Sequence, residues 1–135
     1  MKVYPNKVPK ITAVFGVNPG YDNTITSETI SENEVLELIQ KTCEEYYEET
    51  GRYCSFVVQR VRTLYREEWG CPKGGEDTYR VESTPDPETH VTGRSCLQYI
   101  SDCKNIILTI AKHFEQHTVR IEVENTNIVC EKYVM

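Results

Sequence analysis

Two histidines four residues apart are the first pattern in this sequence that could do chemistry. His113 and His117 fall at positions i and i+4 of a predicted helix, a spacing that lets two imidazoles face one zinc ion. A zincin, however, has glutamate directly after the first histidine, where this chain has Phe114, and a third ligand would have to come from elsewhere. We favour two partly exposed histidines near a helix C-terminus, where the helix dipole stabilises imidazolium. The prediction is therefore no metal and no other cofactor.

A loop cysteine is the second candidate. Cys71 lies close to Lys73, and a neighbouring cation lowers the pKa of a thiol, as a nucleophilic cysteine requires. No histidine lies nearby in the sequence to act as a base, and no C-x-x-C pair is present, so we interpret Cys71 as an incidental loop cysteine. The cysteines are irregularly spaced and most fit core positions, so we predict free thiols and no disulfides for all six: Cys43, Cys54, Cys71, Cys96, Cys103 and Cys130.

Two further patterns suggest phosphate or nucleic acid. The segment from Gly16 to Gly20 follows a predicted strand, but it lacks both the G-x-G-x-x-G spacing and a G-K-[ST] ending, and a plain turn explains it. The predicted strands also carry arginines and tyrosines that could stack bases and hold phosphates, namely Arg60, Arg62, Arg80, Arg120, Tyr65 and Tyr79. Glutamates share these strands and the net charge is −6, so nucleic-acid binding is disfavoured and cross-strand ion pairs are expected.

The sharpest anomaly is a charge imbalance in the predicted helix over residues 32–50. This helix carries seven glutamates against Lys41 alone, and seven minus one equals the magnitude of the whole net charge. Glutamates in the C-terminal half of a helix are mildly unfavourable, so their crowding there is a place where function is worth suspecting. We predict a partner-binding surface made of Glu37, Glu44, Glu45, Glu48 and Glu49. A well-solvated face remains the alternative.

The elements that would position these residues follow from hydrophobic periodicity. Ser31 and Glu34 form a capping box and Gly51 is placed to end the same helix. A second helix starts at Ser95, or at Asp102 in a shorter alternative, and runs to about His117. Strands are predicted over residues 10–17, 53–66, 78–84, 119–124 and 128–134, with turns at 18–20, 85–87 and 125–127.

The order of these elements is β-α-β-β-α-β plus a C-terminal edge strand. Over residues 10–124 this order resembles the ferredoxin-like superfamily, which implies an α+β two-layer sandwich. No linker or repeat divides the chain, so residues 1–135 are expected to form a single domain. The resemblance rests on element order, and that fold hosts enzymes, nucleic-acid binders and interaction modules alike.

Two functions remain compatible with these patterns. The leading hypothesis is a non-catalytic interaction module that presents the acidic helix to a basic protein surface, for example as a small phage-type inhibitor or regulator. The alternative is a small-molecule binder or enzyme of the dimeric ferredoxin-like barrel kind, which would form a homodimer. We find no apolar segment long enough for a membrane and no signal-peptide core, so we expect a cytoplasmic protein with no membrane partner.

Overall fold

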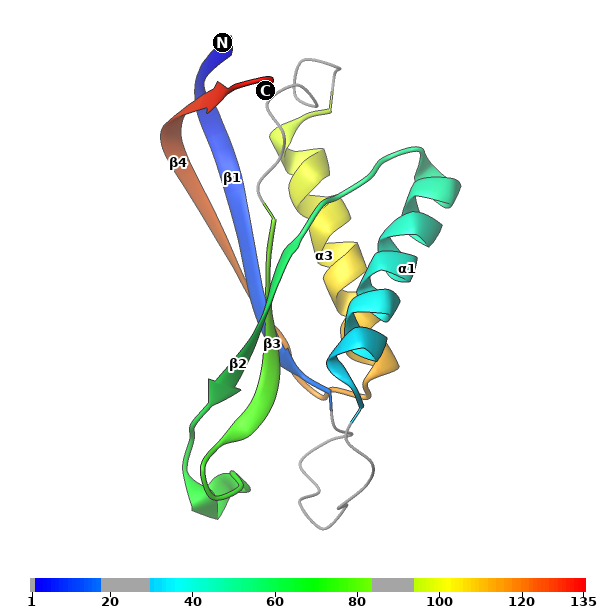
Figure 1. The fold of residues 1–135 in the computed structure, drawn as a ribbon, viewed down its shortest axis with the longest axis vertical. Coiled ribbons are helices and arrows are strands. Elements are labelled where there is room, and N and C mark those ends of the chain that lie inside the picture. The colour runs from blue at the N-terminus through cyan, green and yellow to red at the C-terminus, as the bar shows by residue number, and fades with distance from the viewer. Residues whose placement is uncertain (1, 18–29, 84–93) are drawn as a thin grey trace.

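A computed structural model describes residues 2–17, 30–83 and 94–135 of the chain. Within these ranges, four antiparallel strands form one sheet in the order β2-β3-β1-β4, and two long helices cover one of its faces (Figure 1). This confirms the α+β class. In chain order the elements are β1 (Lys2–Gly16), α1 (Glu32–Thr50), β2 (Val57–Thr63), the 3₁₀ helix η1 (Glu67–Trp69), β3 (Glu76–Ser83), α3 (Cys96–His113) and β4 (Arg120–Lys132). The turns predicted at residues 18–20 and 85–87 lie outside the described residues.

Helix α1 has the predicted bounds because both of its ends are capped. The Ser31 hydroxyl accepts a hydrogen bond from the Glu34 amide at 3.2 Å, which satisfies one of the free N–H groups of the first turn. At the other end Gly51 adopts φ 74°, and its amide donates to the Tyr47 carbonyl at 2.7 Å. This left-handed conformation is one that glycine adopts without steric cost.

Helix α3 begins where the longer alternative predicts, with Ser95 as its N-cap, but it ends four residues early, at His113. The helix closes in a Schellman turn, in which the Glu115 amide donates to the Lys112 carbonyl and the Gln116 amide to the Ala111 carbonyl, each at 3.0 Å. His117 is therefore past the helix, so the prediction that both histidines lie on this helix is wrong. None of the described helices is both long and apolar enough to span a membrane.

The strands at the chain ends differ most from the prediction. Strand β1 begins at Lys2, and β4 is one continuous strand, so the predicted turn at 125–127 and the separate C-terminal edge strand are wrong. The reason is pairing: β1 offers a partner to every residue of β4, from Val14 opposite Arg120 to Lys2 opposite Lys132. Backbone hydrogen bonding along this ladder outweighs the local turn preference of Asn125-Thr126-Asn127.

The core lies between the sheet and the helices. Ile11, Ala13 and Phe15 alternate along β1 toward the helices and are buried against the Ile106 and Ile110 side of α3. Because successive side chains of a strand point to opposite faces, Val14 and Gly16 belong to the face that the helices leave uncovered.

One carboxylate is enclosed in this core. Asp102 is fully buried and accepts hydrogen bonds from the Tyr46 hydroxyl at 2.5 Å, from Arg52 Nε at 3.0 Å and from Gln98 Nε2 at 2.9 Å. Burial alone would raise the pKa of Asp102, but the hydrogen bonds from Arg52, Tyr46 and Gln98 outweigh it and hold the pKa below its ordinary value. The network joins the end of α1 and the segment before β2 to α3.

Candidate functional site

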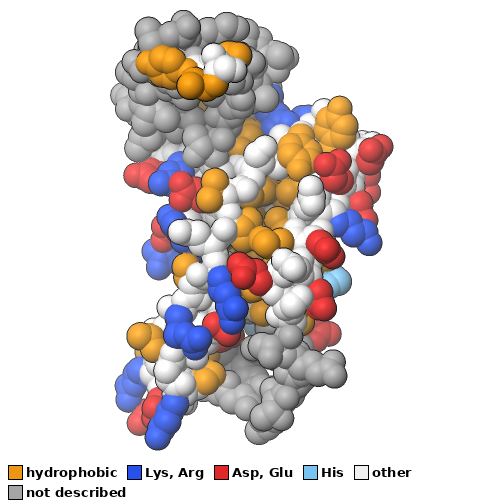
Figure 2. All heavy atoms as spheres, in the orientation of Figure 1, with side chains coloured by type: hydrophobic (Ala, Val, Ile, Leu, Met, Phe, Trp, Pro, Cys, Tyr) orange, Lys and Arg blue, Asp and Glu red, His pale blue; other side chains and the backbone are white. Residues whose placement is uncertain are grey.

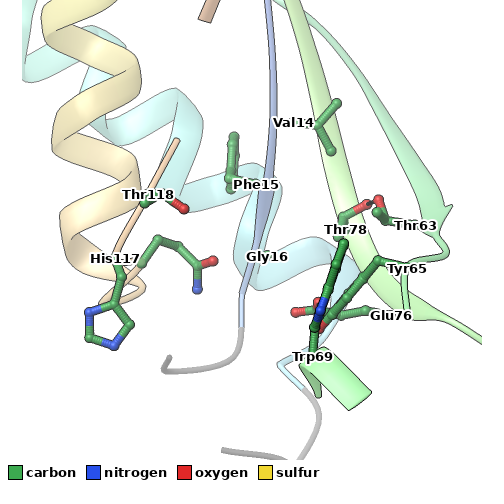
Figure 3. A pocket seen from close by; sticks show the side chains of 11 residues that line it. Val14, Phe15, Gly16, Thr63, Tyr65, Trp69, Glu76, Thr78, His117 and Thr118 are labelled. Carbon is green, nitrogen blue, oxygen red and sulfur yellow. Dashed lines mark hydrogen bonds between the residues drawn. The ribbon is translucent and has the colours of Figure 1, made fainter. Parts of the chain in front are cut away.

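A pocket of about 370 Å³ opens where the end of β1, the β2–β3 hairpin and the segment after α3 meet (Figure 3). Ligand sites in proteins typically have volumes of about 300 to 1,000 Å³, so this pocket can hold a small molecule. It is lined by Val14, Phe15, Gly16, Thr63, Tyr65, Trp69, Glu76, Thr78, Gln116, His117 and Thr118.

The hairpin supplies the charged and aromatic side of the pocket. Glu76 is the first residue of β3, opposite Thr63, and its Oε2 accepts a hydrogen bond from the Tyr65 hydroxyl at 3.1 Å. Tyr65, Trp69 and Glu76 lie together on this side, across Gly16 from His117 and Thr118 (Figure 3). The guanidinium of Arg66 lies 5.5 Å from the centre of the Trp69 ring. The hairpin thus presents an oriented carboxylate together with two aromatic rings.

The floor of the pocket has no side chain at Gly16. A methyl group built on Gly16 would lie 2.7 Å from Glu76 Oε1 and 3.1 Å from Gln116 Oε1, so the absence of a side chain here leaves room for both polar groups. Beside it, the hydroxyls of Thr63 and Thr78 lie 2.8 Å apart, and that of Thr78 donates to the Val61 carbonyl at 2.9 Å. These contacts fix the hairpin next to β1.

The segment after α3 supplies the third side. Glu115 has φ 53°, and it is the one non-glycine residue with a positive φ among the described ranges. This left-handed residue reverses the chain, so that Gln116 follows directly at the pocket. The Gln116 Nε2 donates to the Phe114 carbonyl at 3.1 Å, which orients its carboxamide.

The charge of the lining limits what the pocket can bind. Among the described residues that form it, Glu76 is the one carboxylate, and no lysine or arginine is present. A carboxylate favours a positive ligand, and aromatic faces such as those of Tyr65 and Trp69 attract cations and stack on planar rings. The arrangement is therefore suited to a cationic ligand with an aromatic part.

The predicted partner surface lies elsewhere. Its five glutamates are all exposed on α1, and Lys41 lies 3.8 Å from Glu45. Acidic side chains gather along this edge of the molecule (Figure 2). The C-terminal half of α1 lies at the end of the molecule away from η1, and none of these glutamates lines the pocket (Figure 1).

The other candidate residues are placed as follows. The structure describes no cluster of three or more metal-ligating side chains within residues 2–17, 30–83 and 94–135. Cys71 is buried, with its thiol 3.4 Å from the Pro72 carbonyl, and the described cysteines Cys43, Cys54, Cys96 and Cys103 are also free. The four arginines form ion pairs, Arg60 and Arg62 with Asp77, Arg80 with Glu82 and Arg120 with Glu122. Tyr79 is buried and offers no stacking face.

Comparisons with known proteins decide the family. A family model described as SAM lyase matches residues 9–132. The chain belongs to the SAM lyase family. Two solved structures share its fold: a phage SAM lyase in its apo state, with 16% identity, a TM-score of 0.58, and coverage of 98% of this chain and 92% of that one; and a phage SAM lyase in complex with S-methyl-5′-thioadenosine, with 18% identity, a TM-score of 0.55, and coverage of 93% and 87%. A comparison with curated proteins finds no match.

Membership of the SAM lyase family overturns our leading functional hypothesis. The family points to an enzyme, so the prediction of a non-catalytic interaction module is wrong, and the small-molecule alternative fares better. Glu76, Trp69 and Gln116 are not among the site residues predicted from the sequence, which suggests Tyr65 only as a ring for stacking nucleic-acid bases. The signal in the sequence is weak: a glutamate directly after Gly74-Gly75, eleven residues beyond a tyrosine, in the loop between the strands predicted over residues 53–66 and 78–84.

Proposed function

We propose that this member of the SAM lyase family cleaves S-adenosylmethionine in the pocket around Glu76 and releases S-methyl-5′-thioadenosine. The observation that carries the proposal is the Glu76 carboxylate, the one fixed charge among the described residues of a ligand-sized pocket that Tyr65 and Trp69 also line. S-adenosylmethionine has two cationic groups and a planar adenine, which match the carboxylate and the aromatic rings. The thioadenosine bound to the phage SAM lyase supports the same ligand class.

The bond to be broken follows from the product. The sulfonium carries a methyl group, the 5′ carbon of adenosine and the γ-carbon of the amino acid. S-methyl-5′-thioadenosine keeps the first two, so the sulfur–Cγ bond breaks and its electron pair stays on sulfur. In the route that needs no water, an oxygen of the substrate's own carboxylate attacks Cγ and forms homoserine lactone, whose amine keeps its protons. Charge and atoms balance without an oxidant or an external base.

The lining of the pocket favours this internal attack. No lysine or arginine among the described lining residues would pair with the substrate carboxylate, which therefore stays available as a nucleophile. Glu76 instead holds the cationic part of the substrate and sets its orientation, and an oriented intramolecular reaction gains a large rate advantage over its bimolecular counterpart. Tyr65 keeps the Glu76 carboxylate in place through its hydroxyl.

We further assign the fold to the ferredoxin-like superfamily. The support is the strand order β2-β3-β1-β4 with both helices on one face, which is the arrangement expected when two split β-α-β units interlock. An experimental structure with a different helix crossover would contradict this assignment.

The activity is tested with purified protein and S-adenosylmethionine, with chromatography to quantify S-methyl-5′-thioadenosine. Wild type should release it, and Glu76→Gln should lower kcat/KM by about 100-fold or more, because removing one oriented polar partner of the reacting group typically costs a few kcal/mol. Glu67→Gln is the matched control, since Glu67 is exposed on η1 and does not line the pocket. Folded wild-type protein that releases no thioadenosine would refute the proposal.

Isotope labelling separates a lyase from a hydrolase. In ¹⁸O-water, attack by water on Cγ would place the label in the γ-hydroxyl of homoserine. The lactone route leaves that oxygen unlabelled, because later opening of the lactone takes up water at the carbonyl carbon. Mass spectrometry of the amino-acid product distinguishes the two outcomes, and label at the γ-oxygen would contradict the internal attack.

A further inference from the structure

We propose that Gln116 and Glu76 together form an acceptor pair for the α-ammonium group of the substrate, which makes Gln116 a binding and specificity-determining residue. This inference rests on the proposed function and adds a second contact point to it. Three features support it: the positions of the two side-chain oxygens, the backbone conformation just before Gln116, and the N–H donors of an ammonium group.

Each of the two side chains is oriented by a hydrogen bond of its own. Tyr65 donates to Glu76 Oε2, and this leaves Oε1 as the oxygen beside Gly16. Gln116 donates from Nε2 to the Phe114 carbonyl, which turns its Oε1 toward the same glycine. A methyl group on Gly16 would lie within 2.7 Å of one oxygen and 3.1 Å of the other. Two acceptors therefore converge on one side of a residue that has no side chain.

The backbone around Gln116 supports a functional role. Glu115 occupies the left-handed region at φ 53°, where a residue with a side chain costs about 1 to 2 kcal/mol relative to its relaxed conformation. Glycine is the usual residue at this point of a Schellman turn. Non-glycine residues in strained conformations gather at functional sites, where the surrounding structure holds them. Glu115, the strained residue, directly precedes Gln116, whose side chain reaches Gly16.

An ammonium group fits this pair better than other parts of the substrate do. It carries a positive charge and three N–H donors, so it can donate to a carboxylate and to a carboxamide oxygen at once. A sulfonium has no N–H to donate, and adenine is neutral. Hydrogen bonds between a charged group and an oriented partner are also stronger than those between neutral groups. The pair would fix the amino-acid end of the substrate while leaving its carboxylate unpaired.

Selectivity between substrate and product follows. The ammonium leaves with the amino-acid fragment when the sulfur–Cγ bond breaks, so S-methyl-5′-thioadenosine lacks the group that Gln116 would bind. Loss of Gln116 should therefore weaken the binding of S-adenosylmethionine and leave the binding of the thioadenosine product unchanged. A purely structural role for Gln116 would disturb both ligands alike.

The test compares variants and ligands. Gln116→Leu removes the acceptor and should raise KM for S-adenosylmethionine about 10-fold, as expected for one hydrogen bond to a charged group. Its dissociation constant for S-methyl-5′-thioadenosine, measured by calorimetry, should stay within about two-fold of wild type, since that ligand makes no contact with the lost oxygen. Gln116→Glu keeps an acceptor and should retain or lower KM. Gln40→Leu, at an exposed position of α1, is the matched control.

A deamino analogue of S-adenosylmethionine completes the design and needs no variant to fold. Wild type should bind this analogue more than about 10-fold more weakly than the substrate, and Gln116→Leu should reduce that difference by about 10-fold, because Glu76 still accepts from the ammonium. If Gln116→Leu weakens substrate, analogue and product alike, or weakens none of them, the ammonium pair is wrong while the lyase proposal stands. If wild type neither binds S-methyl-5′-thioadenosine nor releases it from the substrate, both proposals are wrong.

Discussion

At the scale of single residues, Gly16 has more influence on the site than its size suggests. It ends β1 on the uncovered face of the sheet, and its missing side chain defines the space that Glu76 Oε1 and Gln116 Oε1 share. Two side chains from different parts of the sequence therefore depend on one backbone position. Any substituent there must move an oxygen that the proposed chemistry uses.

We expect Gly16→Ala to lower kcat/KM by about 10-fold or more while changing stability little. The added methyl would lie 2.7 Å from Glu76 Oε1, closer than packed atoms allow, and the carboxylate end can give way more easily than the strand. Steady-state kinetics beside a thermal melt measure the two effects. The control is Gly74→Ala, where no atom lies within 4 Å of the new methyl but φ is 84°, so stability should fall and activity should persist. Unchanged kinetics for Gly16→Ala would show that the carboxylate position is not critical.

At the scale of elements, the C-terminal turn of α3 carries a strain that can be removed. Glu115→Gly should raise the free energy of unfolding by about 1 kcal/mol, because glycine adopts a left-handed conformation without the steric cost that Glu115 bears. Urea denaturation of the variant and wild type measures this difference. Glu115 is exposed, so no buried contact is lost. A less stable variant would indicate that the Glu115 side chain makes a compensating interaction.

The Asp102 network gives a second prediction at this scale. Asp102→Asn should lower the free energy of unfolding at pH 7 by about 2 kcal/mol, because a carboxamide in this fully buried position cannot accept all the hydrogen bonds that Tyr46, Arg52 and Gln98 donate to the carboxylate. Asp77→Asn, at the partly exposed pair with Arg60 and Arg62, should cost less than about 1 kcal/mol and serves as the control. Urea denaturation of both variants at pH 7 measures the two losses, and equal losses would contradict the special role of the buried pair.

The same network sets a dependence on pH. The folded-state pKa of Asp102 is lower than its ordinary value of 3.8, so its contribution is fully present above 3.8 and is lost as the pH falls through the folded-state value. The difference in the free energy of unfolding between wild type and Asp102→Asn should therefore be constant near neutral pH and should decrease below about pH 4. Urea titrations at several pH values measure it. A gap that stays constant into acid would show that Asp102 is not ionised in the folded protein.

The elements also show how far the sequence alone could lead. Helix α1 was predictable to the residue because its signals are local, Ser31 with Glu34 at the start and Gly51 at the end. The extent of β4 was not, because Asn125-Thr126-Asn127 favours a turn locally and becomes strand only by pairing with β1. The candidate site was harder to predict from the sequence than either element. Glu76 and Gln116 lie forty residues apart, and only the fold brings both to Gly16.

At the scale of the whole molecule, net charge should affect how the proposed substrate arrives. The protein has a net charge of −6 and S-adenosylmethionine is a cation at neutral pH, so long-range attraction favours their encounter. We expect kcat/KM to fall as salt rises from about 0.01 M to about 1 M, a range over which the screening length shrinks from about 30 Å to about 3 Å. The affinity for neutral S-methyl-5′-thioadenosine, measured over the same range, is the control and should change little. Equal salt dependence for both ligands would contradict electrostatic attraction.

The long pairing of β1 with β4 has a consequence for how the chain reaches this structure. Strand β1 lies in the interior of the sheet, yet one of its two partners, β4, follows it only after α1, β2, β3 and α3, and Lys2 lies opposite Lys132. During synthesis β1 therefore cannot complete its pairing until α1, β2, β3, α3 and β4 have also been made. Contacts so distant in sequence slow folding, into the range of milliseconds to seconds that is usual for sheets closed by remote strands. Charged side chains on a strand discourage pairing with other chains, and Lys10, half-exposed on β1, is placed to do so in the meantime.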